Sequence, residues 1–251
     1  PEVNDLHKLI KKRCILDGEL IVAVNGVPNF FEIQRRSLMT DSFKIKLASI
    51  SKPVSFVAYD IIFYDNKEII DLSLIERKKI LKENVSENKQ LAISRFIEKE
   101  GISFFELVVK KDLEGVVAKR KQSLYFYGKR SKDWIKFKNM YDDDFIICGY
   151  VPDEEPMKIK SLVLGAFKNN KLVYFGHVAL GIPKEEEKII TNFVKENPSE
   201  SHFLEKDVKI KWCKLSLVCT VKYMMRTETN LLRQPIYKGL RFDKDIYECQ
   251  V

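Results

Sequence analysis

Apolar runs alternate with charged segments along the first half of the chain, and their periods predict a mixed α/β fold. Short runs rich in Val, Ile and aromatic residues predict strands. They lie at 14–22, 53–65, 91–97, 113–121 and 133–139. Apolar residues at helical spacing predict helices at 3–13, 72–85 and 98–112, with Ser73 or Asp71 capping the second. We expect a turn at 27–30. The FEIQRRS segment at 31–37 is expected to be either a solvated turn or a contact with DNA phosphate.

The pattern changes after a polar segment, NMYDDDF at 139–145, which predicts a break between two domains. Beyond it, short apolar runs follow at close intervals, and a charged helical segment at 184–197 interrupts them. This pattern is typical of a small β-barrel with one inserted helix, for which an OB-fold is the natural candidate. We therefore expect an α+β protein with domains at 1–139 and 140–251.

Several predicted strands carry charged side chains that a strand alone does not require. Glu114 stands at the start of the apolar run GVVA, and Asp17 and Glu19 are two residues apart, so they share one strand face. Lys136 and Lys138 also alternate and share a face. A lysine pair often protects an edge strand from aggregation, which is the more common case, but it can also clamp phosphate oxygens.

An aromatic residue completes a set of side chains suited to a nucleotide. Tyr59 and Asp60 end the apolar run SFVAYD. A ring can stack on a base, carboxylates can bind ribose hydroxyls or Mg²⁺, and lysines can neutralise phosphate. Taken together, these residues favour a nucleotide site in the first half of the chain.

Composition narrows the range of partners and compartments. The net charge of +8 favours an anionic partner such as nucleic acid, although it also serves solubility. No apolar run approaches the ~20 residues that span a bilayer, and none has the pattern of a secretory h-region. The five cysteines form no CxxC pair, which argues against a zinc site or a disulfide framework and favours the cytoplasm.

Four motifs stand in a fixed order in the first half of the chain: DGEL at 17–20, FVAYD at 56–60, EGVVAKR at 114–120 and WIKFK at 134–138. Their order and spacing resemble those of the covalent nucleotidyltransferases. The closer similarity is to ATP-dependent DNA ligases of the bacterial and archaeal end-joining type. It extends to the connector at 123–139, FGHVALG at 175–181 and LLRQPIYKGLRFDK at 231–244. The resemblance implies a partial adenylation (nucleotidyltransferase) domain followed by an OB-fold domain.

The resemblance also implies a role for each matched side chain. Glu19 would contact the ribose, and Tyr59 would stack on adenine, where relatives more often have Phe. Glu114 would lie at the metal and the nucleotide phosphate. Lys136 and Lys138 would hold the α-phosphate.

Further basic residues match the family in the same way. Arg130 would assist the two lysines at the phosphate. Arg241, Asp243 and Lys244 match the terminal motif that closes over ATP and orients the pyrophosphate leaving group. The lead-in to that motif matches at Arg233, Pro235 and Tyr237.

By this resemblance the intact protein is an ATP-dependent DNA ligase that seals nicks in double-stranded DNA, with ATP and Mg²⁺, through a lysyl-AMP and then a DNA-adenylate. The implied setting is DNA repair and recombination by end joining. We expect a cytoplasmic monomer without membrane contact, fused to or associated with polymerase or nuclease modules.

One departure from the family is large. The family's nucleophile is a lysine in a Lys-x-Asp-Gly pattern, but Ile15 and Leu16 precede the Asp17-Gly18 pair. We therefore expect an N-terminally truncated fragment that cannot adenylate itself. The alternatives are an RNA ligase or capping guanylyltransferase, against which the end-joining-like C-terminus argues, and a non-catalytic nucleic-acid clamp. A Lys-x-Asp-Gly segment upstream would favour the ligase over the clamp.

Overall fold

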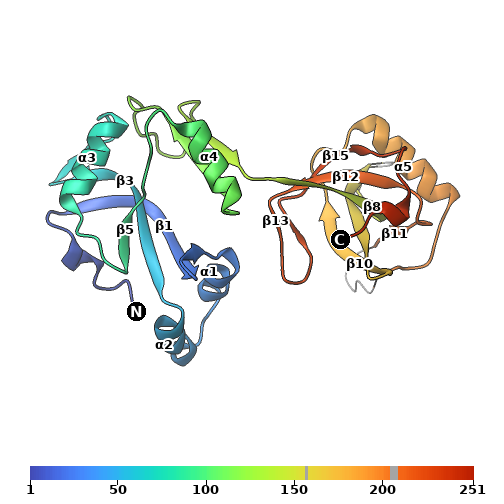
Figure 1. Ribbon diagram of the computed structural model, residues 1–251, viewed down its shortest axis with the longest axis horizontal. Helices are drawn as coiled ribbons and strands as arrows, with labels where there is room; N and C mark the ends of the chain where they lie inside the picture. Colours follow the sequence, from blue (N-terminus) through green and yellow to red (C-terminus); the bar gives the residue numbers. More distant parts are fainter. Residues whose placement is uncertain (156–157, 204–208) are drawn as a thin grey trace. The chain divides into compact units, whose positions relative to one another are not determined.

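The chain divides into two compact units, each described here by itself (Figure 1). A computed structural model describes residues 1–155, 158–203 and 209–251. Unit 1 comprises residues 1–106 and 116–137, and unit 2 comprises residues 107–115 and 138–251. No helix in the described parts of the chain is long and apolar enough to cross a membrane.

A five-stranded sheet forms the centre of unit 1. Its strands are β1 (Cys14–Val24), β2 (Val27–Pro28), β3 (Val54–Tyr64), β4 (Lys67–Glu68) and β5 (Leu91–Ile93). β1 and β3 pair antiparallel over their length, and β5 pairs with β3 in parallel. The hairpin between β1 and β2 turns at Asn25 and Gly26, which have φ angles of 52° and 81°. An Asn-Gly pair favours this left-handed geometry, so the turn lies two residues before the predicted one.

One face of this sheet packs on α3 (Leu74–Asn84) and buries a small apolar core. Ala58 and Ile61 of β3 meet Leu81 of the helix and Leu91 of β5 in that core. Ser73 is the N-cap, as predicted, and its backbone N–H donates to the Glu76 carboxylate at 2.9 Å. This capping box starts the helix where the apolar spacing begins.

Two helices between β2 and β3 correct the sequence analysis. α1 (Phe30–Ser37) contains the FEIQRRS segment, for which we expected either a turn or a contact with DNA phosphate, and α2 (Ser42–Ser51) follows it. Asn29 and Asp41 cap them by accepting backbone N–H bonds from Glu32 and Lys44. Both helices are short, at 8 and 10 residues, which is why the apolar pattern did not identify them. The helix predicted at 3–13 is only a 3₁₀ turn, η1 (Leu6–Leu9), and the strand predicted at 91–97 ends at Ile93.

The remaining predicted elements of the first half are present. They are α4 (Gly101–Lys110), β6 (Gly115–Lys119) and β7 (Trp134–Lys138), and β6 pairs with β7 in a two-stranded sheet. Glu114 directly precedes β6, as the apolar run indicated.

Unit 2 contains a five-stranded antiparallel barrel. Its strands are β8 (Tyr141–Pro152), β9 (Ile159–Lys168), β10 (Lys171–Val178), β12 (Val218–Tyr223) and β15 (Ile236–Leu240), in the order β10-β9-β8-β12-β15. A bridge between Leu180 and Ile236 links the two ends of this order. The helix α5 (Lys184–Glu196) lies between the third and fourth barrel strands in the chain. This is the strand order of an OB-fold with an inserted helix, as predicted.

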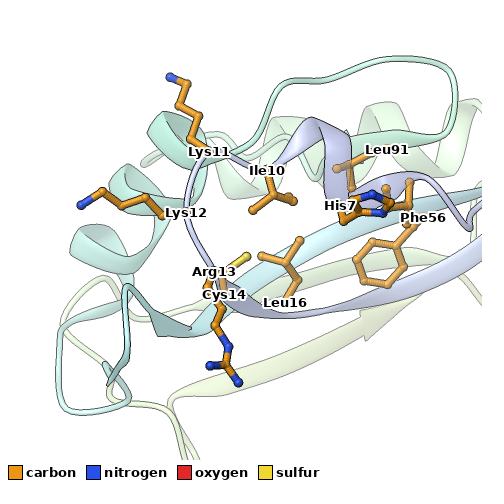
Figure 2. Close-up of a pocket in the computed structure, with 10 residues that line it drawn as sticks. His7, Ile10, Lys11, Lys12, Arg13, Cys14, Leu16, Phe56 and Leu91 are labelled. Carbon is orange, nitrogen blue, oxygen red and sulfur yellow. The ribbon is translucent and has the colours of Figure 1, made fainter.

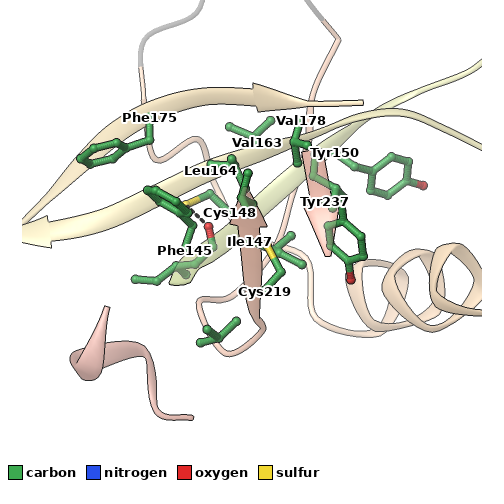
Figure 3. Packing of buried hydrophobic residues seen from close by; sticks show 14 of the residues in the cluster. Phe145, Ile147, Cys148, Tyr150, Val163, Leu164, Phe175, Val178, Cys219 and Tyr237 are labelled. Atoms are coloured by element: carbon green, nitrogen blue, oxygen red, sulfur yellow. Dashed lines mark hydrogen bonds between the residues drawn. The ribbon is translucent and has the colours of Figure 1, made fainter. Parts of the chain in front are cut away.

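The barrel encloses the larger of the two cores (Figure 3). Phe145 of β8 and Phe175 of β10 meet with their ring centroids 5.3 Å apart. Four of the five cysteines lie buried in this unit: Cys148, Cys213, Cys219 and Cys249. Smaller elements complete the unit: β11 (Lys211–Trp212), which pairs with β8, the hairpin of β13 (Met225–Arg226) and β14 (Leu232–Arg233), and the 3₁₀ turn η2 (Ile246–Glu248).

The predicted domain break lies close to the change from unit 1 to unit 2 between residues 137 and 138, but the polar segment at 139–145 is not a linker, because β8 begins at Tyr141. Asp142, Asp143 and Asp144 are strand residues opposite Lys222, Val221 and Thr220 of β12. Aspartate is depleted in strands, which is why the segment looked like a linker. Here basic partners override that preference, since Asp143 pairs with Arg226 and Asp144 pairs with Arg241 and Lys244.

Candidate functional site

One face of the β1–β3 pair carries four of the polar residues that the sequence singled out. Asp17 lies directly opposite Asp60 in the antiparallel register, so their side chains share a face. The Tyr59 hydroxyl donates a hydrogen bond of 2.7 Å to Glu19, which shares the face of Asp17 by alternation. We call the surface formed by Asp17, Glu19, Tyr59 and Asp60 the Glu19 face.

A β-bulge explains how the consecutive residues Tyr59 and Asp60 reach the same face. The register passes from the Asp17–Asp60 pair to the Gly18–Ala58 pair, so Tyr59 is the extra residue of β3 between them. Such an extra residue breaks the simple alternation and redirects a side chain. Gly18 permits the close approach at this point, because a Cβ there would overlap the carbonyl oxygen of Val57.

Asp60 is fully buried and forms an ion pair with the equally buried Arg77 of α3. The guanidinium donates from Nε and Nη2 to the two carboxylate oxygens at 3.0 and 2.9 Å. It also donates to the carbonyl oxygens of Leu72 and Ser123 at 2.5 and 3.2 Å. A buried charge of each sign is tolerated only with such complete pairing, so this contact fixes Asp60 rather than leaving it for a ligand.

A second basic residue, Lys119 at the end of β6, interacts electrostatically with Asp17 and Asp60. Its ammonium lies 3.7 Å from the ring centroid of Trp134, and the indole donates to Ser123 Oγ at 2.9 Å. Burial lowers the pKa of Lys119, while the charges of Asp60 and Asp17 partly offset that effect. Burial and the neighbouring Asp17 raise the pKa of Tyr125 to about 12. We assigned no role to these residues from sequence, although the charged end of EGVVAKR was a signal for Lys119.

In unit 2, Glu114 and Lys138 already have polar partners. Glu114 forms an ion pair with Arg233 of β14. The Lys138 ammonium donates to the side-chain oxygen of Gln234 at 2.6 Å. Both partners belong to the lead-in of the terminal motif, of which the sequence had singled out Arg233.

The three predicted residues of the terminal motif, Arg241, Asp243 and Lys244, lie together around Asp144 of β8. Arg241 donates to both oxygens of Asp243 at 2.8 Å. Asp144 accepts from Arg241 at 3.2 Å and from Lys244 at 2.6 Å. Burial would raise the pKa of Asp144, but hydrogen bonds from Lys244 and Thr220 and the charge of Arg241 bring it below its usual range. We call these side chains, with that of Thr220, the Asp144 cluster.

Lys136 and Arg130 are exposed, and neither forms an ion pair within the described parts of the chain. The structure therefore brings Glu19 and Tyr59 together in unit 1, and Arg241, Asp243 and Lys244 together in unit 2. Glu114 and Lys138 each contact the lead-in segment instead.

A cavity of about 350 Å³ in unit 1 is a different feature from these sites (Figure 2). Its apolar wall includes Leu16 and Phe56, and Lys11, Lys12 and Arg13 lie at its edge. None of the predicted site residues lines it. Leu16 precedes Asp17 in β1, so it points to the opposite side of the sheet from the Glu19 face.

No group of three or more His, Cys, Asp or Glu side chains suited to a metal occurs among the described residues. Mg²⁺ does not need such a group, because it commonly keeps several waters and binds through one or two carboxylates and the phosphates of a substrate. The Glu114 carboxylate, about half exposed at 54%, fits that mode of binding.

Family comparisons cover most of the chain. Residues 1–138 match the family described as ATP dependent DNA ligase domain, and residues 156–244 match the ATP dependent DNA ligase C terminal region. The multifunctional non-homologous end joining protein LigD of Mycolicibacterium smegmatis is 31% identical over 94% of this chain. The chain spans only 30% of that relative's length.

Solved structures of DNA ligases are similar in fold. A mycobacterial DNA ligase D complexed with ATP and MES is 26% identical over 99% of this chain and 80% of its own, with a TM-score of 0.50. A Lig E DNA ligase is 19% identical over 90% of this chain and 76% of its own, with a TM-score of 0.62. The α+β fold with an OB-fold barrel is confirmed by these likenesses and by the strand order of unit 2. The chain belongs to the ATP-dependent DNA ligase family.

Proposed function

We propose that the chain is the greater part of a ligase catalytic core that seals nicks in double-stranded DNA. Residues 1–139 would form the adenylation domain and residues 140–251 the OB-fold domain. The observation that carries the proposal is the contact of Tyr59 with Glu19, at 2.7 Å, on a strand face that also bears Asp17. An aromatic ring beside a carboxylate suits a nucleoside, with the base on the ring and a ribose hydroxyl on the acid.

The other matched residues would act on phosphate. Lys136, Lys138 and Arg130 would neutralise the α-phosphate, since exposed strand lysines and an arginine can each donate to its oxygens. Glu114 would hold Mg²⁺, which supplies charge stabilisation at the phosphate when it is bound. For this, Glu114 must exchange its contact with Arg233 for the metal.

Arg241 and Lys244 would orient the pyrophosphate that leaves ATP, and Asp243 would hold Arg241 in place through two hydrogen bonds of 2.8 Å. Two cations so close in the chain can contact two phosphate groups of one ligand. Their contribution therefore belongs to the step that consumes ATP.

The family's Lys-x-Asp-Gly pattern does not occur in these 251 residues. We therefore expect this chain to catalyse the step that needs no lysine, in which the 3′-hydroxyl of a nick attacks the phosphate of a DNA-adenylate. The new bond is the phosphodiester, the phosphoanhydride bond to AMP breaks, and the hydroxyl proton passes to solvent.

Polymerase or nuclease modules would accompany this chain, because relatives are named as multifunctional end-joining proteins. A cytoplasmic DNA-repair role agrees with the five free cysteines. We propose a monomer acting on nicked DNA.

The test uses this chain, Mg²⁺ and a nicked duplex that already carries AMP on its 5′-phosphate. We expect sealing of this substrate, and no covalent label from α-labelled ATP. Glu114→Ala and Lys138→Ala should each slow sealing by two to three orders of magnitude, as is typical for loss of about 3–4 kcal/mol of transition-state stabilisation. Lys171→Ala, at an exposed strand lysine of β10, is the matched control.

Four results would contradict this assignment. Acid-stable label from ATP would show that a lysine of this chain is a nucleophile. Near-normal sealing by Glu114→Ala with a lowered Tm would give that residue a structural role. Tight binding of the nick without sealing by the unmodified chain would favour the nucleic-acid clamp, for which the charge of +8 is the supporting observation. A preference for nicked RNA over DNA would favour an RNA ligase.

A further inference from the structure

We infer that Asp144 is a positioning residue that sets the spacing of Arg241 and Lys244 for a two-phosphate ligand. This inference rests on the proposed role of the terminal motif in pyrophosphate binding. No family motif in the sequence includes Asp144, which lay in the segment we took for a linker.

The position of Asp144 is fixed before it meets the two cations. It is a strand residue of β8 opposite Thr220 of β12, and it accepts a hydrogen bond of 2.5 Å from the Thr220 hydroxyl. Its side chain is only 12% exposed. A carboxylate held by a barrel strand is a rigid anchor, whereas Arg241 and Lys244 lie in a turn after β15.

The anchor joins both cations through one carboxylate. Arg241 Nη1 lies 3.4 Å from Oδ1 and 3.2 Å from Oδ2, and Lys244 Nζ lies 2.6 Å from Oδ2. The Arg241 backbone N–H also donates to the Val218 carbonyl oxygen at 2.8 Å. Lysine and arginine side chains otherwise have large rotamer freedom, so this contact reduces the number of arrangements of the pair.

The contacts leave both cations able to bind a further anion. A guanidinium has five N–H groups and an ammonium has three. The contacts of Arg241 with Asp144 and Asp243 use at most four of the five, and Lys244 uses one. Asp144 therefore orients the N–H groups of Arg241 and Lys244 and leaves some of them free to bind a phosphate. This is what preorganisation of a binding site requires, whereas a carboxylate that only competed with the phosphate would occupy those groups.

The alternative is that Asp144 only lowers the positive charge of the cluster. The two ideas predict opposite changes when Asp144 is replaced by Asn. The quantity that changes is the Kd for inorganic phosphate divided by the Kd for pyrophosphate: the loss of charge raises this ratio, and the loss of positioning lowers it. Removing a negative charge strengthens binding of both anions, and strengthens it more for pyrophosphate, which carries more charge. Losing the spacing of the two cations weakens only the ligand that bridges them.

The experiment titrates this chain with inorganic phosphate or pyrophosphate, each with Mg²⁺, and follows the Arg241 Nε–H and Lys244 side-chain NMR signals. We expect Asp144→Asn to lower the phosphate-to-pyrophosphate Kd ratio about tenfold, because fixing two flexible side chains is worth roughly that much affinity. Asp143→Asn is the control, because it removes a neighbouring negative charge that contacts Arg226 and not the two cations. It should leave the Kd ratio within about twofold of that of the unmodified chain.

A second variant, Asp144→Glu, tests the inference in case Asp144→Asn does not fold. Asp144→Glu keeps the charge but moves the carboxylate by one methylene, so positioning predicts a lowered ratio and charge alone predicts an unchanged one. An unchanged or raised ratio in Asp144→Asn would overturn the inference. If the unmodified chain itself shows no preference for pyrophosphate at Arg241 and Lys244, the proposed role of the terminal motif fails, and the positioning role fails with it.

Discussion

Tyr59 is held in place by its hydroxyl as well as by its ring. The hydroxyl donates to Glu19, and the bulge in β3 turns the side chain toward the Glu19 face. Relatives of the resembled family more often carry Phe at this position. In this chain the stacking residue and the expected ribose contact are therefore joined by a hydrogen bond that Phe could not make.

Substitutions at Tyr59 separate stacking from hydrogen bonding. Tyr59→Ala should weaken ATP binding by about 1–3 kcal/mol, the usual value of stacking a base on an aromatic ring. Tyr59→Phe keeps the ring and should cost less than about 1 kcal/mol, because it removes one exposed hydrogen bond. Calorimetric titration with ATP measures both. Equal losses in the two variants would show that the hydroxyl, and not the ring, is what matters.

Asp60 and Arg77 are the most deeply buried charges of unit 1. Asp60→Ala leaves the Arg77 charge buried without its partner, and removing one member of such a pair commonly costs about 3–5 kcal/mol. Urea unfolding followed by the fluorescence of Trp134, in unit 1, measures the loss. A double variant, Asp60→Ala with Arg77→Met, should recover much of it. A single variant as stable as the unmodified chain would show that water reaches this site.

Most strands and long helices follow from apolar periodicity, and the exceptions have physical causes. β1, β3, β6, β7 and α3 lie close to where the pattern predicts them. The first residues of β8 were misjudged, because three aspartates are stabilised in the strand by basic partners distant in sequence. Local propensity contains no information on such partners. The helices α1 and α2 were missed because they are only 8 and 10 residues long, although Asn29 and Asp41 mark their starts.

The candidate site also has parts that the sequence predicts and parts that it does not. The strand positions of Glu19, Tyr59 and Glu114 could be predicted, since motifs and alternation both mark them. The bulge at Tyr59 could not, because a one-residue shift of register depends on pairing between strands. The same holds for Lys119 on the ring of Trp134 and for Asp144, whose partners are brought together only by folding.

The two units differ in the size of their cores, and this predicts the order in which they unfold. The main cluster of unit 2 includes Phe145, Leu164 and Phe175, and it is far larger than the cluster around Ala58, Ile61 and Leu81 in unit 1. Since buried apolar area is the main source of stability, unit 1 should unfold at lower urea. Trp134 reports on unit 1 and Trp212 on unit 2.

Measurement of this order needs one single-tryptophan variant for each unit, Trp134→Phe and Trp212→Phe. The fluorescence transition of Trp134 should come at the lower urea concentration, with that of Trp212 above it. Saturating pyrophosphate should raise only the Trp212 transition, because its proposed site lies in unit 2. Coincident transitions without ligand would show that the two units unfold together.

The distribution of the cysteines gives the chain a single natural site for chemical labelling. Cys14 is half-buried in unit 1, whereas the other four thiols are buried in unit 2. Burial raises the pKa of Cys14, an effect that a hydrogen bond with Asn84 partly offsets. In unit 2, burial raises the pKa of the Cys213 thiol to about 12 and also raises that of Cys148. A thiol reacts as its thiolate, so these groups are inert to maleimides and mild oxidants while the barrel stays folded. A fluorophore could therefore be attached at Cys14 without engineering. Cys14 lines the cavity beside Leu16, on the opposite side of the sheet from the Glu19 face, so the label would report on ligands that enter that cavity.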